Sequence, residues 1–318
     1  MGVINGVPNP PYFQDFMSIQ TPFGLLTSPA SRVAAYVCSS GAWDGAPVEI
    51  RNATVTTLDL GLQKCRTGFA DIVYVLPGHL ENVTATTCIL AQQVAGAQVI
   101  GIGHGALRPR FTWTATTGIW NVTVSSMRFT NLILDVGGAN GVVNSILFTG
   151  TDNTIDNCEI IGSSSATLYS LIPIQVAATA HRCTITRNLF RSVGVIGAVT
   201  EWIQVAGTSD LTKITHNEFL TQGATSLTIN VAGAATRLVI ANNEIAVTAA
   251  TAPSVGVIVL ANAISTGYVS RNTIYNIVAG NAFAGGITLG GASLCGFWDN
   301  RNCDEILLSA VLTPVVGT

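Results

Sequence analysis

A six-residue pattern that recurs every 26 to 31 residues constrains the fold of this chain more than any other feature. Each copy has a β-branched or aromatic residue, two variable residues, a position most often occupied by Asn, one variable residue, and then Ile or Phe. A repeat of this kind is typical of a solenoid, in which each coil packs only on its neighbours. The copies lie at 124–129, 155–160, 185–190, 214–219, 240–245 and 269–274, with a partial copy at 297–302.

A second strand pattern keeps phase with the first. In four repeats an apolar-x-apolar triplet ends nine residues before the leading residue of the six-residue pattern. Small residues follow each triplet, and no helical pattern of about ten residues fits between the strands. We therefore expect each repeat to hold a strand, a corner, a second strand, a tight bend and a third stretch. The triplets are Ile174–Val176, Ile203–Val205, Ile229–Val231 and Ile258–Leu260.

The recurrent Asn stands between two apolar positions five residues apart. Such positions face opposite ways in an unbroken strand, so the chain must bend at the Asn. Asn tolerates the left-handed backbone region and bonds neighbouring backbone groups. The sequence thus predicts an all-β fold, a single-stranded parallel β-helix. Coils about 4.8 Å apart would join the amides into one ladder of Asn188, Asn217, Asn243, Asn272 and Asn300.

The N-terminal third is typical of the entry to such a solenoid. Leu58, Leu62 and Cys65 have helical spacing, which predicts a short amphipathic helix at 57–66 that Gly68 ends. Strands are expected at 70–79, which closes on Pro-Gly-His, and at 98–103. This order resembles the entry to pectate-lyase-like right-handed parallel β-helices, over about 57–305. The resemblance implies a right-handed solenoid with an N-terminal capping helix, but no activity, because that superfamily includes enzymes and structural virion proteins.

Residues 1–50 differ in kind from the β-helix domain expected at 51–318. Their prolines exclude regular structure over much of the segment, which predicts an extended arm. For Ser31–Val37 the alternative is a turn or two of helix. The arm either docks onto a partner or straps over its own β-helix. The apolar segment 306–317 needs cover from the terminal coil or a neighbouring subunit. The predicted partner-binding residues are Pro8, Pro10, Pro11, Tyr12, Phe13 and Phe16.

Charge is scarce in this chain. Asp, Glu, Lys and Arg make up 10% of the residues, against about 25% in a typical soluble domain. This suits a surface that is largely covered by symmetric contacts. The net charge of −3 excludes a generic nucleic-acid binder, which needs clustered Lys and Arg. Mean hydropathy is +0.47, yet no apolar run approaches the roughly 18 residues of a membrane-spanning helix, so no membrane association is expected.

The cysteines indicate a reducing compartment during synthesis. They number seven, an odd count without metal-type spacing, and the chain opens without a secretory signal. Buried free thiols and synthesis in a host cytoplasm fit this pattern. The alternative is a Cys295–Cys303 or Cys65–Cys88 bridge formed after release into an oxidising medium.

The residues beside the Asn row are the best catalytic candidates, since both flanking rows should face outward. Glu218 and Glu244 would lie on successive coils, about 5–7 Å apart, where two carboxylates can share acid and base roles in glycoside cleavage. The simpler interpretation, which we favour, predicts no catalytic residue and a solvated face of offsetting charges. That face would comprise Arg187, His216, Arg271 and Arg301 with Glu159, Glu218, Glu244 and Asp299.

Other motifs carry weaker signals. The Asp-Asp pair of polygalacturonase-like hydrolases is missing, and Asp152 and Asp156 fit corner hydrogen bonding better than a hard-cation site, so neither metal nor cofactor is predicted. Gly101–Ala106 imitates a dinucleotide fingerprint, but Pro109 blocks the helix that would follow, so a tight turn is expected. His181 near Cys183 favours a structural histidine over a nucleophile pair. Trp202 and Trp298 lie in repeat strands, where packing is the default.

Two classes of function remain. A short β-helix with a Pro-rich arm resembles structural proteins of tailed-bacteriophage virions, and residues 71–81 look like stretches of such proteins. The resemblance implies a non-enzymatic virion protein. Of the virion roles, a capsid decoration or cement protein is favoured over a spike or fibre. Its partners would be the major capsid protein or tail components, and it would be a homo-oligomer, with a trimer favoured. The alternative is a spike-associated polysaccharide lyase or hydrolase, or a carbohydrate-binding β-helix without turnover.

Overall fold

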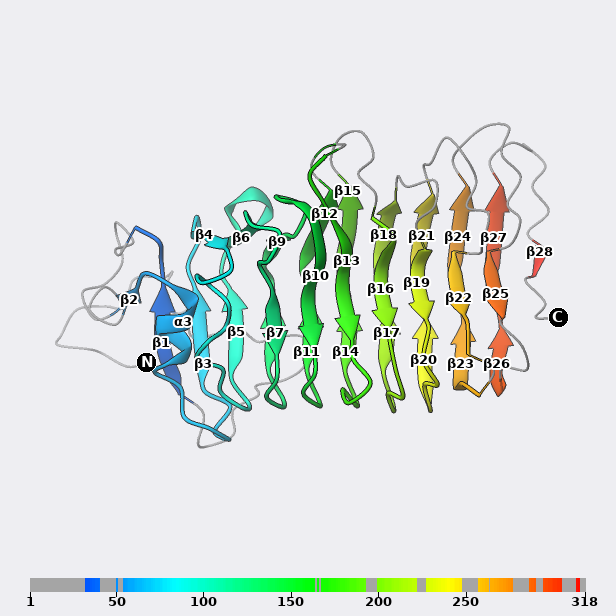
Figure 1. Cartoon of the computed structure of the whole chain (residues 1–318), viewed down its shortest axis with the longest axis horizontal. Coiled ribbons are helices and arrows are strands. Elements are labelled where there is room, and N and C mark those ends of the chain that lie inside the picture. The colour runs from blue at the N-terminus through cyan, green and yellow to red at the C-terminus, as the bar shows by residue number, and fades with distance from the viewer. Residues whose placement is uncertain are drawn as a thin grey trace, which may run out of the picture.

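The structure is a computed structural model of the chain. It describes residues 32–40, 50, 54–163, 165, 167–192, 199–221, 227–247, 257–262, 264–276, 286–289, 294–304 and 313–314. Within these ranges the chain winds as a solenoid, with successive coils side by side from the blue N-terminal part to the red C-terminal part (Figure 1). The predicted all-β parallel β-helix is confirmed.

One face of the solenoid is a parallel sheet of eleven described strands. Neighbouring strands come from successive coils, so the order in space follows the chain from β3 onward. The strands are β2 (Thr54–Val55), β1 (Val33–Val37), β3 (Ile72–Val75), β5 (Gln98–Gly101), β8 (Arg128–Thr130), β11 (Thr154–Asp156), β14 (Thr184–Thr186), β17 (Lys213–Thr215), β20 (Leu238–Ala241), β23 (Thr266–Ser270) and β26 (Leu294–Trp298).

The other described strands form a seventeen-stranded sheet, which comprises two parallel rows and a short antiparallel strand, β28 (Thr313–Pro314). The first row is β4 (Leu80–Val83), β6 (Arg110–Trp113), β9 (Ile133–Asp135), β12 (Glu159–Ser163), β15 (Leu189–Ser192), β18 (Glu218–Thr221), β21 (Glu244–Val247), β24 (Thr273–Asn276) and β27 (Arg301–Asp304). The second row is β7 (Trp120–Val122), β10 (Asn140–Phe148), β13 (Tyr169–Val176), β16 (Glu201–Val205), β19 (Leu227–Val231), β22 (Ile258–Leu260) and β25 (Ile287–Leu289).

The core consists of like residues stacked coil on coil. Ile185 pairs in register with Ile155 on one side and Ile214 on the other, and all three are fully buried. In the next row of strands, the rings of Phe190 and Phe219 stack with their centroids 4.4 Å apart. The leading and closing apolar positions of the repeat therefore fill the interior from two different strands, which is why they are five residues apart.

The predicted Asn ladder is confirmed. Asn217 Oδ1 accepts from both the backbone N–H and the Nδ2 of Asn188, each at 3.0 Å. Asn188 Nδ2 also donates to the carbonyl of Ile155 at 3.1 Å. Cys158 begins the series, since its backbone N–H donates to Asn188 Oδ1 at 2.9 Å. The same bonds continue through the buried amides of Asn243, Asn272 and Asn300.

The bend itself uses the residue before the ladder position, not the Asn as the sequence predicts. These residues have φ between +52° and +64°, in the left-handed region, whatever their side chain. A left-handed residue bends the chain from one sheet into the next and turns the following side chain inward, where the amide meets the next coil. The residues are Ser126, Asn157, Arg187, His216, Asn242, Arg271 and Asp299.

The predicted capping helix forms as α3 (Leu58–Leu62), where Leu58 and Leu62 are buried and α3 packs on β1, β2 and β3. It begins at Thr57, whose hydroxyl accepts from the backbone N–H of Leu60 at 3.3 Å. The helix is shorter than the predicted 57–66, because the backbone N–H of Arg66 donates to Asp71 Oδ2 at 2.9 Å instead of to a helical carbonyl. A single 3₁₀ turn among the described residues, η1 (Gly105–Leu107), ends the tight turn expected after 101.

The helical alternative for Ser31–Val37 is wrong, because Val33–Val37 form β1 and pair in parallel with β2 and β3. Strand β3 realises the strand expected at 70–79, but β1 lies beyond it in the sheet, so β3 is not the outermost strand. Residues 1–31, which include the six predicted partner-binding residues, lie outside the described residues. So does most of the apolar segment 306–317.

Two of the thiols in the bridge alternatives, Cys65 and Cys88, are free. Cys65 and Cys88 form no disulfide, so that alternative is wrong, while the side chain of Cys303 lies outside the description. Burial raises the pKa of the Cys158 thiol to about 12 and that of Cys183 to about 11. These thiols are core residues and poor nucleophiles.

Candidate functional site

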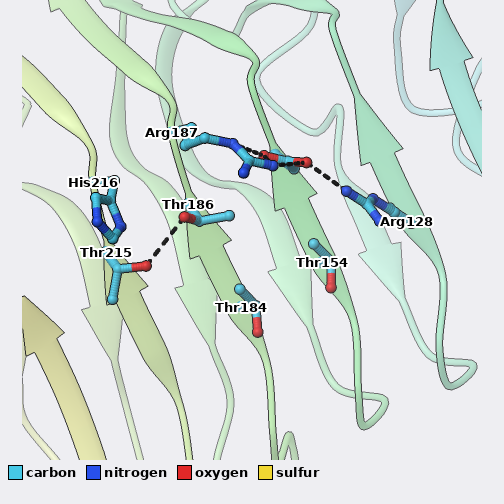
Figure 2. Close-up of a pocket in the computed structure, with 8 residues that line it drawn as sticks. Arg128, Thr154, Thr184, Thr186, Arg187, Thr215 and His216 are labelled. Atoms are coloured by element: carbon cyan, nitrogen blue, oxygen red, sulfur yellow. Dashed lines mark hydrogen bonds and ion pairs between the residues drawn. The ribbon is translucent and has the colours of Figure 1, made fainter. Parts of the chain in front are cut away.

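A pocket of about 420 Å³ lies on the outer face of the eleven-stranded sheet, across β8, β11, β14 and β17 (Figure 2). Side chains alternate along each short strand, so the middle residue enters the core and the two flanking residues point outward. The parallel registers then place outward residues of four successive coils beside one another. The lining residues are Arg128, Thr154, Asp156, Thr184, Thr186, Arg187, Thr215 and His216.

Asp156 is held between two arginines. Arg187 donates through Nε to Oδ1 at 2.9 Å and through Nη2 to Oδ2 at 2.6 Å, a bidentate contact. Arg128 Nη2 donates to Oδ2 at 2.6 Å from the other side. Figure 2 shows the two guanidinium groups on opposite sides of the carboxylate. Arg187 reaches it from the left-handed bend of its own coil, so the bend both turns the chain and aims the side chain.

Threonines form the rest of the pocket. The outward positions of β14 are Thr184 and Thr186, and Thr154 lies in register beside Thr184. The hydroxyls of Thr186 and Thr215 are 3.1 Å apart and share a hydrogen bond across neighbouring coils. These side chains present hydroxyl groups, each of which can donate and accept, beside the arginines.

Positive charge lies outermost in this pocket. The Asp156 side chain is only 2% exposed, whereas the side chains of Arg128 and Arg187 are 22% and 36% exposed. The exposed His216 also lines the pocket, and the exposed Lys213 lies outside the lining, in register with Thr184. A molecule that enters the pocket meets guanidinium and hydroxyl groups, with the carboxylate covered beneath.

A second charged cluster lies on the first row of the seventeen-stranded sheet. Glu159 accepts from Arg108 and, at 2.5 Å, from Arg191 Nε. Arg110 Nη2 donates to Asp135 Oδ2 at 3.0 Å, while Asp135 Oδ1 is buried without a hydrogen-bond partner among the described residues. Burial raises the pKa of Asp135, and the charge of Arg110 offsets only part of that effect. Arginines therefore hold these carboxylates in place.

Glu218 and Glu244 lie where the sequence predicts. They are paired in register on β18 and β21, and both are exposed. Within the described part of the chain neither makes an ion pair, and the predicted charge offset takes another form: Arg187 pairs with Asp156 and Glu159 pairs with Arg108 and Arg191. Two exposed carboxylates side by side without a charged partner are a surface feature that, by itself, specifies no reaction.

The remaining sequence candidates have structural partners. Asp152 pairs with Arg182 at 2.6 Å and Asp156 with its two arginines, so the two aspartates do not combine into a cation site. His181 Nδ1 accepts from the backbone N–H of Asp210 at 3.1 Å, which confirms a structural histidine. Across the residues that the structure describes, no three His, Cys, Asp or Glu side chains gather as metal ligands, and no helix has the length and apolarity to span a membrane.

The tryptophans that the structure describes divide into two groups. Trp113, Trp120 and Trp202 are buried in the core, which confirms the packing role expected for Trp202. Trp298 differs from that expectation, because its outward position on β26 leaves it 45% exposed. Its ring packs against that of Tyr268 in a tilted arrangement, with centroids 5.1 Å apart.

Comparison with known proteins found no family model, no curated protein and no solved structure that matches this chain. The fold and the geometry above are therefore the basis for any functional proposal.

The pocket is the site that sequence reasoning missed. From the sequence alone, Asp156 is expected to be a corner residue or a cation ligand, and Arg187 to offset the charge of outward acids. The available signal was the outward pair of each strand: Thr-Ile-Asp at 154–156, Thr-Ile-Thr at 184–186 and Lys-Ile-Thr at 213–215 place polar residues on one face of consecutive coils.

Proposed function

We propose that this chain is a non-enzymatic structural protein that enters a larger assembly as a rigid β-helix. The assembly we propose is a tailed-bacteriophage virion, in which the chain is a homo-oligomeric decoration or cement protein in contact with the major capsid protein or tail components. The support for the virion is the sequence resemblance, namely a short β-helix preceded by a Pro-rich arm. The support for docking comes from the surface of the last coils.

The observation that carries the proposal is the apolar edge at β26, the last strand of the eleven-stranded sheet in the described part of the chain. Leu294 is 70% exposed and Trp298 45% exposed on this strand, and Ile264, just before β23, is 65% exposed. A sheet edge offers unpaired backbone groups, and apolar side chains beside it favour association with another protein. This edge supports docking through an apolar surface.

The arrangement of the acids supports a role without catalysis. Asp71, Asp156 and Glu159 are buried and each is bonded to two arginines. The oxygens of these carboxylates are already engaged by guanidinium groups, which leaves them poorly placed to exchange a proton with a substrate. The alternative, polysaccharide cleavage or glycan binding by a spike, depends on the exposed pair Glu218 and Glu244.

The test replaces two apolar side chains at this edge with charged ones. The double variant Leu294→Lys, Trp298→Lys should remain a folded β-helix and lose incorporation into particles, measured by co-sedimentation with the assembly. Leu107→Lys is the matched control, because Leu107 is 65% exposed but follows β5, which six strands separate from β26 in the sheet. Full incorporation of the double variant would refute docking through this edge.

Two further variants separate the arm and the enzyme alternative. Deletion of residues 1–30 should abolish incorporation while leaving a soluble β-helix, and normal incorporation of the truncated chain would remove the arm from the proposal. The double variant Glu218→Gln, Glu244→Gln should behave as the wild type does. Loss of polysaccharide cleavage in that variant, with unchanged folding, would establish the enzyme instead.

A further inference from the structure

We propose that the pocket across β8, β11, β14 and β17 binds an oxyanion, a carboxylate, sulfate or phosphate group carried by a small molecule. The lining of this pocket carries a net positive charge. Two guanidinium groups, Arg128 and Arg187, surround a single carboxylate, Asp156, so the lining carries one excess positive charge before His216 is counted. The exposed Lys213 on β17 adds to the positive potential.

The layering of these groups makes the excess charge available to a ligand. A buried carboxylate requires a charged partner, and the bidentate contact of Arg187 already meets that requirement. Arg128 adds a second positive charge on the far side of the carboxylate. Because Asp156 is covered and the arginines are partly exposed, an incoming anion approaches the cations more closely than it approaches the acid.

The threonines complete the site chemically. Planar guanidinium groups bind carboxylate, sulfate and phosphate oxygens through charge-assisted hydrogen bonds. The hydroxyls of Thr154, Thr184 and Thr186 lie along the same outward face and can donate to further oxygens or to hydroxyls of the ligand. The volume of about 420 Å³ is larger than one oxyanion needs and falls in the range of roughly 300–1,000 Å³ for small-molecule pockets.

The Asp156 carboxylate has a positioning role in this proposal. It fixes both guanidinium groups before a ligand arrives, so little side-chain freedom is lost on binding. The right geometry thus exists without the ligand, and the site does not depend on whether the chain docks into an assembly.

The full chain is titrated separately with inorganic sulfate, inorganic phosphate and acetate. Binding is monitored by NMR of the arginine Nε–Hε groups and the His216 ring. NMR is chosen because sulfate stabilises folded proteins generally, which would obscure a thermal-shift assay. We expect saturable shifts, with Arg187→Gln weakening the affinity by about 10- to 100-fold, the usual effect of a charge-assisted hydrogen bond. The anion with the highest affinity shows whether the pocket prefers tetrahedral or planar oxyanions.

Arg66→Gln is the matched control, since Arg66 also makes a bidentate contact to a buried aspartate, Asp71, that has a second arginine in Arg32. It should leave anion affinity unchanged. Thr184→Val keeps both ion pairs and should weaken binding by about 2- to 10-fold, which tests the site even if Arg187→Gln fails to fold. Shifts that rise linearly with salt, or equal affinities in the wild type, Arg187→Gln and Thr184→Val, would overturn the proposal.

Discussion

The Asn ladder and the pocket lie in the same coils, yet they organise polar groups in opposite ways. The ladder is inside, uncharged and repeated: each amide, such as Asn217, makes the same bonds to the coils before and after it. The pocket is outside and charged, and it lies where Asp156 interrupts an outward column that is Thr130 on one side and Thr186 on the other. In this solenoid, a repeated polar row holds the coils together, and a departure from the repeat marks a local site.

The largest predicted effect comes from breaking the ladder in its middle. Asn217→Ala removes the acceptor of the Asn188 backbone and amide groups and the donor to the Ile185 carbonyl. Buried polar groups left unpaired cost about 1–3 kcal/mol each, so we expect the free energy of unfolding to fall by about 3 kcal/mol or more. Urea denaturation measures this free energy of unfolding. Glu218→Ala, at the exposed neighbouring residue, should change it by less than about 0.5 kcal/mol, and equal losses in both variants would contradict the comparison.

A second prediction uses pH, because the ladder amides do not titrate and the arginine-held carboxylates do. Hydrogen bonds from Arg66 hold the pKa of Asp71 well below its usual range. The unfolded chain therefore takes up the proton first, so this stabilisation is complete above about pH 4 and is lost as the pH falls further. Arg66→Gln should be destabilising at neutral pH, and its difference from the wild type should shrink below about pH 4.

Urea denaturation of the wild type and of Arg66→Gln between neutral and acidic pH gives the difference in their free energies of unfolding. Arg271→Gln is a suitable control, since Arg271 is exposed and makes no ion pair within the described residues. A pH-independent difference between Arg66→Gln and the wild type would show that Asp71 does not contribute through its charge.

The smallest predicted effect concerns the left-handed bend beside the Asn ladder. Arg271 has φ +53°, a conformation that costs an L-residue about 1–2 kcal/mol and glycine almost nothing. Part of this gain is lost to the greater freedom of glycine in the unfolded chain. Arg271→Gly should therefore be more stable than Arg271→Ala by about 1 kcal/mol. Equal melting of the two variants would show that the bend is not strained.

The sequence was sufficient for the fold because the fold depends on a repeated local rule. The spacing of Asn188, Asn217, Asn243 and Asn272 specifies the coil, and the apolar positions around each specify two core-facing strands. The predicted position of the bend is one residue away from the observed one. Asn tolerates the left-handed region by itself, whereas the adjacent Arg, His and Asp adopt it only under tertiary constraint. Strand β1 was missed because its pairing with β3 joins residues far apart in the chain.

The pocket was much harder to predict, because it depends on contacts between coils rather than within one. Arg128 and Asp156 are 28 residues apart and Arg187 is 31 residues beyond Asp156. Seen in one repeat, each is an ordinary charged residue on an outward row. Only the register of β8, β11 and β14 brings them together, and a one-residue slip would turn Asp156 inward.

The uneven steps between ladder residues have a consequence for how such a chain can change. Asn217 and Asn243 are 26 residues apart and Asn243 and Asn272 are 29 apart, yet their amides meet with the same geometry. Segments between corners can thus gain or lose residues while the corners stay aligned. Duplication of one complete coil would lengthen the rod without creating an unfamiliar contact, so proteins built on this plan can grow by copying a short stretch of their own gene.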